Sequence, residues 1–429
     1  MTDVFYRAPA LTYPQISHGE GIYLWDTEGR RYLDGASGAL VANLGHGRGE
    51  IAQAMADQAA KVAFAHSARF TSAAQEELAS RIAHLLPWNL RHTYPVSGGS
   101  EATETAVKLA RQYFLEQGEP SRFKVLSRWA SYHGNSLGAL SASGHLGRRR
   151  PYLPLLSSAF VHFDPPNPRC PGPDADGDCD CSRSLRATLE REDPRSVAAI
   201  LMEPVGGSAS SGSVPHQGYM AAVRRIADQH GILLIADEVM TGFGRTGEIL
   251  GMVHFGVAPD LITCAKGLSG GYAPLGAVVA NDRVYQAILQ GSGRFAHGFT
   301  FGGHLVACAA GARALAILEG EGLVENARRM GSLLRVGLET LQSKFEVLNQ
   351  VRGLGLMQGL VLNSTEPKGA TAARLADLAF SGGLIIYPGS GGPGGLDGDH
   401  LLVAPPLIIQ ETGVQELVGL LERALRSLA

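Results

Sequence analysis

Three ionisable residues each follow an apolar run that has the character of a buried strand. Glu203 closes AAILME, Asp237 closes ILLIAD, and Lys266 closes LITCAK. Ligands of open α/β sheets bind beyond the carboxyl ends of the strands, so these three side chains are expected to face one cleft. Each residue alone could be a polar strand end at the surface. Three such ends in succession favour a site with one lysine and two carboxylates.

Lys266 is the only basic residue in LITCAKGLSGGYAPLGAVV, residues 261–279. Burying a charged lysine is costly unless the charge is paired or removed. A lysine that is bonded to a carbonyl compound as an imine avoids this cost and becomes a chemical handle. The position of Lys266 therefore suggests a covalent role.

The segment PVSGGSEATETAVKLAR, residues 95–111, places small residues before a predicted helix. Backbone amides at a helix start attract anions, and Gly98, Gly99 and Ser100 would let a phosphate come close. The alternative is an ordinary helix start with Ser100 as the N-cap, which the local sequence alone favours. The segment has no Walker lysine, and its spacing is not that of a dinucleotide-binding loop.

The stretch SYHGNS, residues 131–136, adds the ring of Tyr132 and the imidazole of His133, although a core tyrosine and a surface histidine would fit it equally well. With the groups above they complete what pyridoxal 5′-phosphate requires, namely a phosphate site, an aromatic plate, a carboxylate and a lysine. The lysine forms an imine with the cofactor, and the aspartate keeps the pyridine nitrogen protonated. Once substrate releases it, the lysine is a base at the substrate carbon.

Ordered motifs along nearly the whole chain resemble the class III aminotransferases, pyridoxal-phosphate enzymes of fold type I. Their number and order make the resemblance specific. The motifs are YLDGASGALVANLGHG, SGGSEATETAVKLAR, YHG, EPV, DEVMTGFGRTG, AKGLSGGYAPLGAV, HGFTFGGH and VAPPLII.

The resemblance implies roles for the residues that match these motifs. Lys266 is expected to form the Schiff base, Asp237 to pair with the pyridine nitrogen, and Glu203 to set the local charge near Asp237. Thr300 is expected to reach the phosphate of the neighbouring subunit, so the resemblance also implies a homodimer with the active site at its interface. The expected cofactor-binding residues are Gly98, Gly99, Ser100, Tyr132 (stacked on one ring face), His133, Asp237, Val239 (packed on the other), Lys266 and Thr300.

Two departures from the family pattern bear on the substrate. Many members that act on α-amino acids have an arginine three residues before the paired prolines, where this chain has Leu402. Those members also often have glutamine after DEV, where this chain has Met240. Both differences resemble the ω-amine side of the family, which often binds the keto acid through a flexible arginine. Candidate arginines are Arg352, Arg294 and Arg69, with surface ion pairs as the alternative, and candidate pocket aromatics are Phe70, Trp25 and Tyr23, with core packing as the alternative.

Short apolar runs alternate with helical segments around the candidate site. FKVLSR, VAAILMEPV, ILLIADEV and LITCAK predict strands, and GYMAAVRRIADQHG predicts a helix between the second and third. Residues 48–63, 72–86 and 103–118 have helical spacing, and GIYLWDTEGRRYLDG predicts a β-hairpin. Buried strands alternating with helices predict an α/β fold with a mostly parallel sheet flanked by helices.

The last hundred residues differ from this pattern. VRGLGLMQGLVL, a helix near 370–381, GLIIYPG, HLLVAPPLII and a helix at 411–428 predict a smaller α+β domain. The N-terminal hairpin is expected to join it, which would make this domain discontinuous. The predicted division is 1–60 for the N-terminal part of the small domain, 61–320 for the large cofactor-binding domain, and 321–429 for the C-terminal part of the small domain.

Composition narrows the class of protein. The chain has 429 residues, of which 45% are hydrophobic, so it can bury a large core. Its net charge of -3 gives no electrostatic case for nucleic acid or anionic membranes. Five cysteines, an odd number in a long chain, favour reduced thiols and a cytoplasmic location. No apolar stretch is long enough to predict a membrane span.

Two segments stand outside this scheme. RCPGPDADGDCDCSRS, residues 169–184, has three cysteines and four aspartates. A solvated surface insertion is favoured over a metal site, because the cysteines lack a partner at zinc spacing and the acids lack the glutamate that ends a calcium loop. HLGRRRP, residues 145–151, is expected to be solvated surface, not a nucleic-acid patch.

The predicted function is transamination from an amine or amino acid, of ω-amino type, to a 2-oxo acid such as pyruvate, by a ping-pong mechanism. The alternatives are an aminomutase of the glutamate-1-semialdehyde type, or a racemase. DEVMTGF is shared with the mutases, whereas the following GRTG favours the transferase. A non-enzymatic binding protein is disfavoured because Lys266 and Asp237 are both present.

Overall fold

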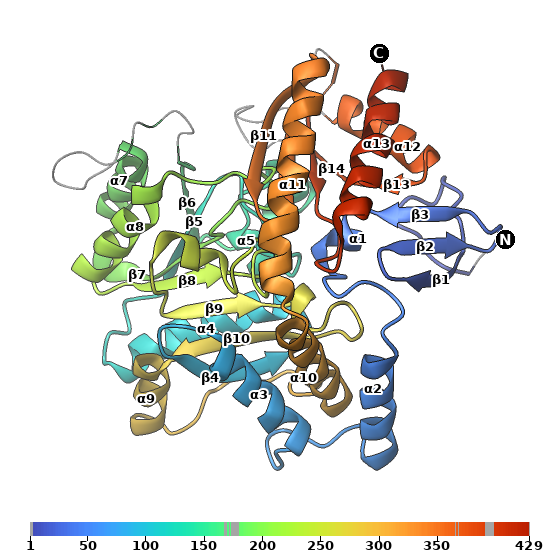
Figure 1. The fold of residues 1–429 in the computed structure, drawn as a ribbon. Coiled ribbons are helices and arrows are strands. Elements are labelled where there is room, and N and C mark those ends of the chain that lie inside the picture. The colour runs from blue at the N-terminus through green and yellow to red at the C-terminus, as the bar shows by residue number, and fades with distance from the viewer. Residues whose placement is uncertain are drawn as a thin grey trace.

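A seven-stranded sheet forms the centre of the computed structural model (Figure 1), which describes residues 3–166, 170, 172, 180–364, 366–367, 369–390 and 399–428. The strand order is β4–β10–β9–β8–β7–β5–β6. The strands are β4 (Leu90–Val96), β5 (Lys124–Arg128), β6 (Phe160–Phe163), β7 (Val197–Met202), β8 (Leu233–Asp237), β9 (Leu261–Cys264) and β10 (Gly276–Asn281).

The five neighbouring strands β6, β5, β7, β8 and β9 are parallel to one another. β10 runs antiparallel to both β9 and β4. The prediction of a mostly parallel sheet is therefore confirmed. The four strands predicted for this sheet are all present, but β4, β6 and β10 were not predicted. β10 was missed because its sequence continues a stretch rich in glycine, which resembles a loop.

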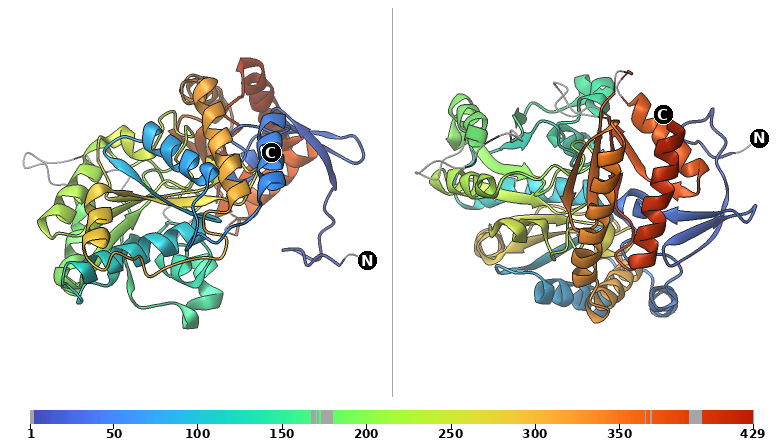
Figure 2. Two further views of the ribbon diagram at one scale, coloured as in Figure 1. Left: turned by 90° about the horizontal axis from the view of Figure 1, so that it is seen from below. Right: turned by 45° about the horizontal axis from the view of Figure 1, so that its top comes forward.

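Helices cover both faces of this sheet. Along β7, Ile200 and Met202 point into one core layer and Ala199 and Leu201 into the other, as the alternation of side chains along a strand requires. The first layer packs against α3 (Ala73–Leu85), α7 (Arg183–Glu192), α8 (Gln217–Gln229) and α10 (Leu305–Gly320). The second packs against α4 (Gly99–Glu116) and α9 (Asp282–Gln290), and Figure 2 (left) shows α3 and α4 on opposite sides.

Two four-stranded sheets lie beside the large one. The first has the order β1 (Ile16–Glu20), β2 (Tyr23–Asp26), β3 (Arg31–Asp34) and β13 (Leu384–Ile385). The second has the order β11 (Leu348–Leu354), β12 (Met357–Leu362), β15 (Asp399–Val403) and β14 (Tyr387–Ser390). They pack with α11 (Leu323–Lys344), α12 (Ala370–Ser381) and α13 (Glu411–Leu428) (Figure 1).

The hairpin of β2 and β3 pairs with the C-terminal region through β13, which runs parallel to β3. This pairing supports a small domain built from both ends of the chain, and the smaller discontinuous α+β part of the predicted fold is present. The exact domain boundaries stay a prediction. α2 (Gly49–Lys61), at the predicted border, packs against α10 of the large region.

The remaining α-helices are short and connect the larger elements. They are α1 (Ser37–Leu40), α5 (Leu137–Ala142) and α6 (Leu146–Arg149). Among the described residues, none of the helices combines the length and the apolar character that crossing a membrane requires.

Candidate functional site

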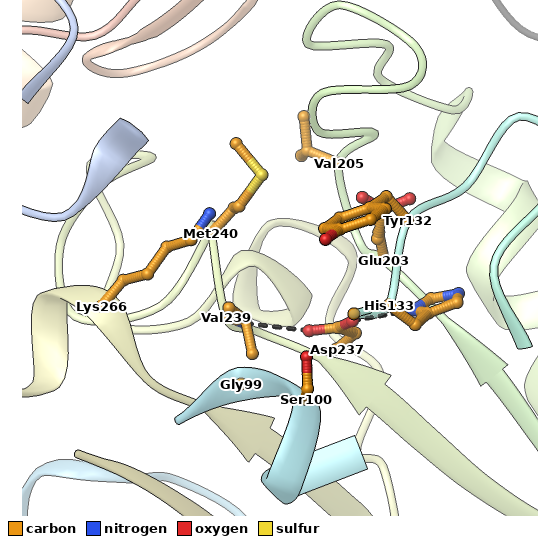
Figure 3. A pocket seen from close by; sticks show the side chains of 11 residues that line it. Gly99, Ser100, Tyr132, His133, Glu203, Val205, Asp237, Val239, Met240 and Lys266 are labelled. Atoms are coloured by element: carbon orange, nitrogen blue, oxygen red, sulfur yellow. Dashed lines mark hydrogen bonds and ion pairs between the residues drawn. The ribbon is translucent and has the colours of Figure 1, made fainter. Parts of the chain in front are cut away.

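A cavity of about 190 Å³ opens at the carboxyl ends of β7, β8 and β9 (Figure 3). Most of the predicted site residues meet here, and Gly98 and Thr300 are absent from the lining. The lining residues are Gly99, Ser100, Tyr132, His133, Gly134, Glu203, Val205, Asp237, Val239, Met240 and Lys266.

The start of α4 forms the floor of this cavity. The helix begins at Gly99 with Gly98 as its N-cap, so the alternative in which Ser100 is the N-cap is wrong. The Ser100 hydroxyl instead accepts a hydrogen bond of 2.9 Å from the Asn135 amide. A side chain at Gly134, where φ is +136°, would lie 2.6 Å from that hydroxyl, so the glycine permits the close approach of these two loops. Amides of the first helical turn have no partner within the helix, which supports an anion site.

Asp237 is held by hydrogen bonds from three directions. Its Oδ2 lies 2.7 Å from Nδ1 of His133, and its Oδ1 accepts from the Val239 amide and the Thr263 hydroxyl, each at 3.1 Å. The His133 and Asp237 side chains are both buried. These contacts orient the carboxylate toward the cavity, between Tyr132 on one side and Val239 on the other (Figure 3).

Lys266 extends into the cavity from the opposite wall (Figure 3). Its backbone is left-handed, with φ of +47°, a strained conformation that lysine seldom adopts outside functional sites. Within the described part of the chain its ammonium makes no ion pair or hydrogen bond. Burial lowers the pKa of Lys266 to about 8, against the opposing effect of the Asp237 and Glu203 carboxylates. A fraction of this amine is therefore neutral near physiological pH, more than for an ordinary lysine.

Glu203 lies beside the cavity directly after β7. Its Oε1 accepts a hydrogen bond of 3.0 Å from the Gly207 amide, while its buried Oε2 has no partner among the described residues. Burial raises the pKa of this carboxyl group, although His133 and Arg128 act in the opposite direction. A buried acceptor without a partner is uncommon in a folded protein, and it marks this carboxylate as available to another group.

Sequence reasoning missed Arg148, which packs against Tyr132, a residue of the cavity lining. Its guanidinium carbon lies 4.6 Å from the centre of the Tyr132 ring, and its Nη2 lies 3.5 Å from the Tyr387 hydroxyl. The prediction that residues 145–151 are solvated surface is therefore wrong for Arg148, and also for the buried Arg149, which donates to three backbone carbonyls. The sequence of a basic run does not indicate which of its arginine side chains is buried.

None of the arginines named from sequence lines this cavity. Arg352 donates to the backbone carbonyls of Ser210 and Ser211, and Arg294 and Arg69 are exposed. The pocket aromatics named from sequence are also placed elsewhere. Tyr23 donates to Glu416, Trp25 stacks on His18, and the Phe70 side chain is 66% exposed.

Buried charged groups fix the DEVMTGFGRTG loop that supplies Val239. Glu238, whose pKa burial raises to about 7, accepts from the Thr241 hydroxyl and from the amides of Gly251 and Met252. Arg245 is fully buried and donates to the carbonyls of Leu356 and Pro405 and to the side chains of Ser37 and Asn43. Burial lowers its pKa to about 9. These contacts join the loop to both smaller sheets.

Both the sequence and the structure of this chain are similar to those of known aminotransferases. The model of the family described as Aminotransferase class-III matches residues 7–425. The chain is 34% identical to the uncharacterized aminotransferase YodT of Bacillus subtilis, over 95% of this chain and 94% of that protein. It is 33% identical to the putrescine–pyruvate aminotransferase of Pseudomonas aeruginosa, over 96% and 90%. An amine transaminase from an uncultivated Pseudomonas species, solved in its PLP-bound form, superposes with a TM-score of 0.92 at 33% identity, covering 100% of this chain and 99% of that one.

Proposed function

Since this chain belongs to the class III aminotransferases, we propose that it moves an amino group from a primary amine or ω-amino acid to a 2-oxo acid such as pyruvate. Its cofactor is pyridoxal 5′-phosphate. The single observation that carries the proposal is the buried Lys266 amine, which faces a cavity shared with the Asp237 carboxylate and makes no ion pair within the described residues.

The residues around the cavity fit this cofactor. Lys266 offers an amine that is partly neutral, and Asp237 offers a carboxylate whose direction is fixed by His133 and Thr263. The start of α4 offers backbone amides next to Gly98, where a side chain would meet nothing within 4 Å. Tyr132 and Val239 would enclose the ring between them.

When bound, the cofactor supplies an aldehyde that takes up the amino group and a ring that accepts electron density from the substrate carbon. The chain's residues would bind it, orient it and move protons. Asp237 would hold a proton on the pyridine nitrogen, and His133 would keep that carboxylate in place. Lys266 would carry a proton to and from the substrate carbon, since its lowered pKa lets it act as a base near neutral pH. Glu203 would help to set the local charge close to Asp237.

One cavity would serve both substrates in turn, which supports a ping-pong order in which the first product leaves before the acceptor binds. The name of the putrescine–pyruvate aminotransferase supports pyruvate as the acceptor and an amine as the donor. The apolar Met240 and Val205 on the lining suit a donor whose carbon chain next to the amino group is apolar.

Arg148 is the arginine that we propose to contact the acceptor carboxylate. It is half-buried beside Tyr132, and its charge is close enough to act on the pKa of Lys266. A guanidinium recognises a carboxylate through two parallel hydrogen bonds. Arg352 is a weaker candidate because backbone carbonyls already occupy its donors.

We also propose a homodimer in which Thr300 reaches the cofactor phosphate of the partner subunit. Thr300 is exposed on the single chain, and the neighbouring Phe301 is 57% exposed and in ring contact with the exposed Phe64. Exposed aromatic groups of this kind are typical of interfaces. Sedimentation equilibrium should give twice the chain mass of 45.3 kDa, and a monomeric active enzyme would contradict the dimer. The cytoplasmic location stays a prediction.

The function is tested by incubating the enzyme, loaded with pyridoxal 5′-phosphate, with putrescine or β-alanine and with pyruvate. Alanine should form in step with loss of the donor, and double-reciprocal plots at several pyruvate concentrations should be parallel. A donor that is isomerised or racemised without alanine would favour a mutase or racemase and overturn the proposal. Omitting pyruvate is the control.

A further inference from the structure

Cys170, Cys181 and His216 converge at a place that the transaminase chemistry does not use. One ligand atom from each residue, the two thiol sulfurs and a ring nitrogen, lies within 4.8 Å of the other two. The three residues come from separate parts of the chain. Cys170 follows β6, Cys181 lies in the short helix η2 (Asp180–Ser182), and His216 is the N-cap residue of α8.

The three residues of this cluster are held in place by the surrounding protein. The Cys181 side chain is only 6% exposed and belongs to the main core, against which the half-buried Cys170 packs. His216 is also half-buried, with its ring in an edge contact with buried Tyr219. The prediction that residues 169–184 form a solvated insertion is therefore wrong for Cys170 and Cys181, while Cys179 and its neighbours at 173–178 lie outside the described residues.

The three ligand types select a particular class of metal. Thiolate and imidazole favour zinc and disfavour calcium and magnesium, which require oxygen ligands. In a tetrahedral zinc site the neighbouring ligand atoms lie roughly 3.5 Å apart, so the observed spacing requires movements of only about 1 Å. Neutral imidazole and deprotonated thiol are the forms of these side chains that bind metals.

We propose that Cys170, Cys181 and His216 bind a structural zinc ion. Each thiol would lose its proton to solvent as the metal binds, and the tetrahedral site would keep one further position for another ligand. The ion would fasten the chain between β6 and α7 to the start of α8. Because residues 203–216 run from Glu203 at the cofactor cavity to His216, it would also anchor the far end of that loop.

The first test measures zinc in the intact enzyme, reconstituted with zinc and then dialysed. Wild-type protein should retain about one zinc ion per chain, whereas Cys181→Ser and His216→Gln should retain little. Cys308→Ala is the matched control, because Cys308 is also a buried cysteine but lies in α10. Wild-type protein without zinc, or Cys181→Ser with as much zinc as wild type, would overturn the proposal.

A second measurement does not depend on the folding of a variant. Cobalt(II) added to the metal-depleted wild-type enzyme should produce the charge-transfer absorbance of thiolate ligands, and added zinc should abolish it. No such absorbance would contradict thiolate ligation. A disulfide between Cys170 and Cys181, found by peptide mapping of enzyme prepared without reductant, would also contradict the site.

Discussion

The buried charged groups at the two ends of the central strands differ in how well they are paired. Asp260, directly before β9, receives hydrogen bonds from the Leu234 amide at 2.9 Å, Arg224 at 2.9 Å, Arg283 at 2.6 Å and Asn281 at 3.1 Å. Lys266, just after the same strand, makes no ion pair within the described residues and has a strained backbone. One four-residue strand thus separates a satisfied carboxylate from an unsatisfied amine.

The pKa shifts follow the same division. Burial alone would raise the pKa of Asp260, but Arg224 and Arg283 outweigh it and the pKa is lowered. At the other end burial prevails, so the pKa of Lys266 falls to about 8 and that of Glu203 rises. The amino end of the sheet therefore stabilises the fold, and the carboxyl end keeps reactive groups at a cost in stability.

Replacing Asp237 by Asn should strongly reduce catalysis and leave the fold almost unchanged. The variant keeps the size of the side chain but removes the charge that would hold a proton on the cofactor ring. We expect kcat to fall by about a hundredfold to a thousandfold, with little change in the free energy of unfolding. Steady-state kinetics with a saturating donor and pyruvate measure the loss. Unchanged kcat would show that Asp237 has no part in the chemistry.

Replacing Asp260 by Asn should lower the stability of the fold and leave kcat nearly unchanged. It removes the buried carboxylate that both Arg224 and Arg283 contact and leaves the mostly buried Arg224 with only its ion pair to the exposed Asp228, which should lower the free energy of unfolding by about 3 kcal/mol. Because the folded pKa of Asp260 is lowered, its contribution is present above the ordinary aspartate pKa and is lost as pH falls through the folded value. Urea unfolding at neutral and acid pH measures this, and kcat should stay near wild type. Loss of kcat without loss of stability would contradict the comparison.

Replacing Lys266 by Met should stabilise the cofactor-free protein while abolishing its activity. Below pH 8 the folded chain carries a charged amine that burial disfavours, so the variant should be more stable by about 2 kcal/mol at pH 7. This advantage should shrink as pH rises from about 8 toward lysine's ordinary pKa of 10.5, because the folded wild type has then already lost its proton. Thermal unfolding across this pH range measures it. A destabilised variant at pH 7 would argue that the amine is not under strain.

Replacing Arg148 by Met should give the smallest of these effects. Methionine keeps an unbranched side chain against Tyr132 but cannot bind a carboxylate. The KM for pyruvate should rise about tenfold, whereas the KM for a donor without a carboxylate, such as putrescine, should not change. Arg150→Met is the matched control, since Arg150 is exposed in the same basic run. Equal changes in both KM values would indicate a general disturbance of the cavity.

Much of the site could be predicted from the sequence because its residues lie at the ends of strongly apolar strands. The runs ending near Glu203, Asp237 and Lys266 could hardly be anything except buried strands of one sheet, and parallel strands bring their carboxyl ends together. The discontinuous smaller region could also be predicted, because alternating patterns recur at both ends of the chain.

The remainder depends on contacts that local patterns do not encode. The sequence does not indicate that Arg148 turns inward while Arg150 stays in solvent, since both belong to one basic run. It does not connect His216 with cysteines thirty or more residues earlier, because their approach depends on how α8 packs near η2. The strand β10 was missed because it continues a glycine-rich stretch that resembles a loop, and only its pairing with β4 and β9 shows that it is a strand.

The most direct test asks which lysine carries the cofactor. The enzyme loaded with pyridoxal 5′-phosphate is reduced with borohydride, digested and analysed by peptide mass spectrometry. The account predicts that the cofactor-derived mass is found on the peptide that contains Lys266 and on no other. A fully active enzyme whose label lies on any other lysine would contradict it.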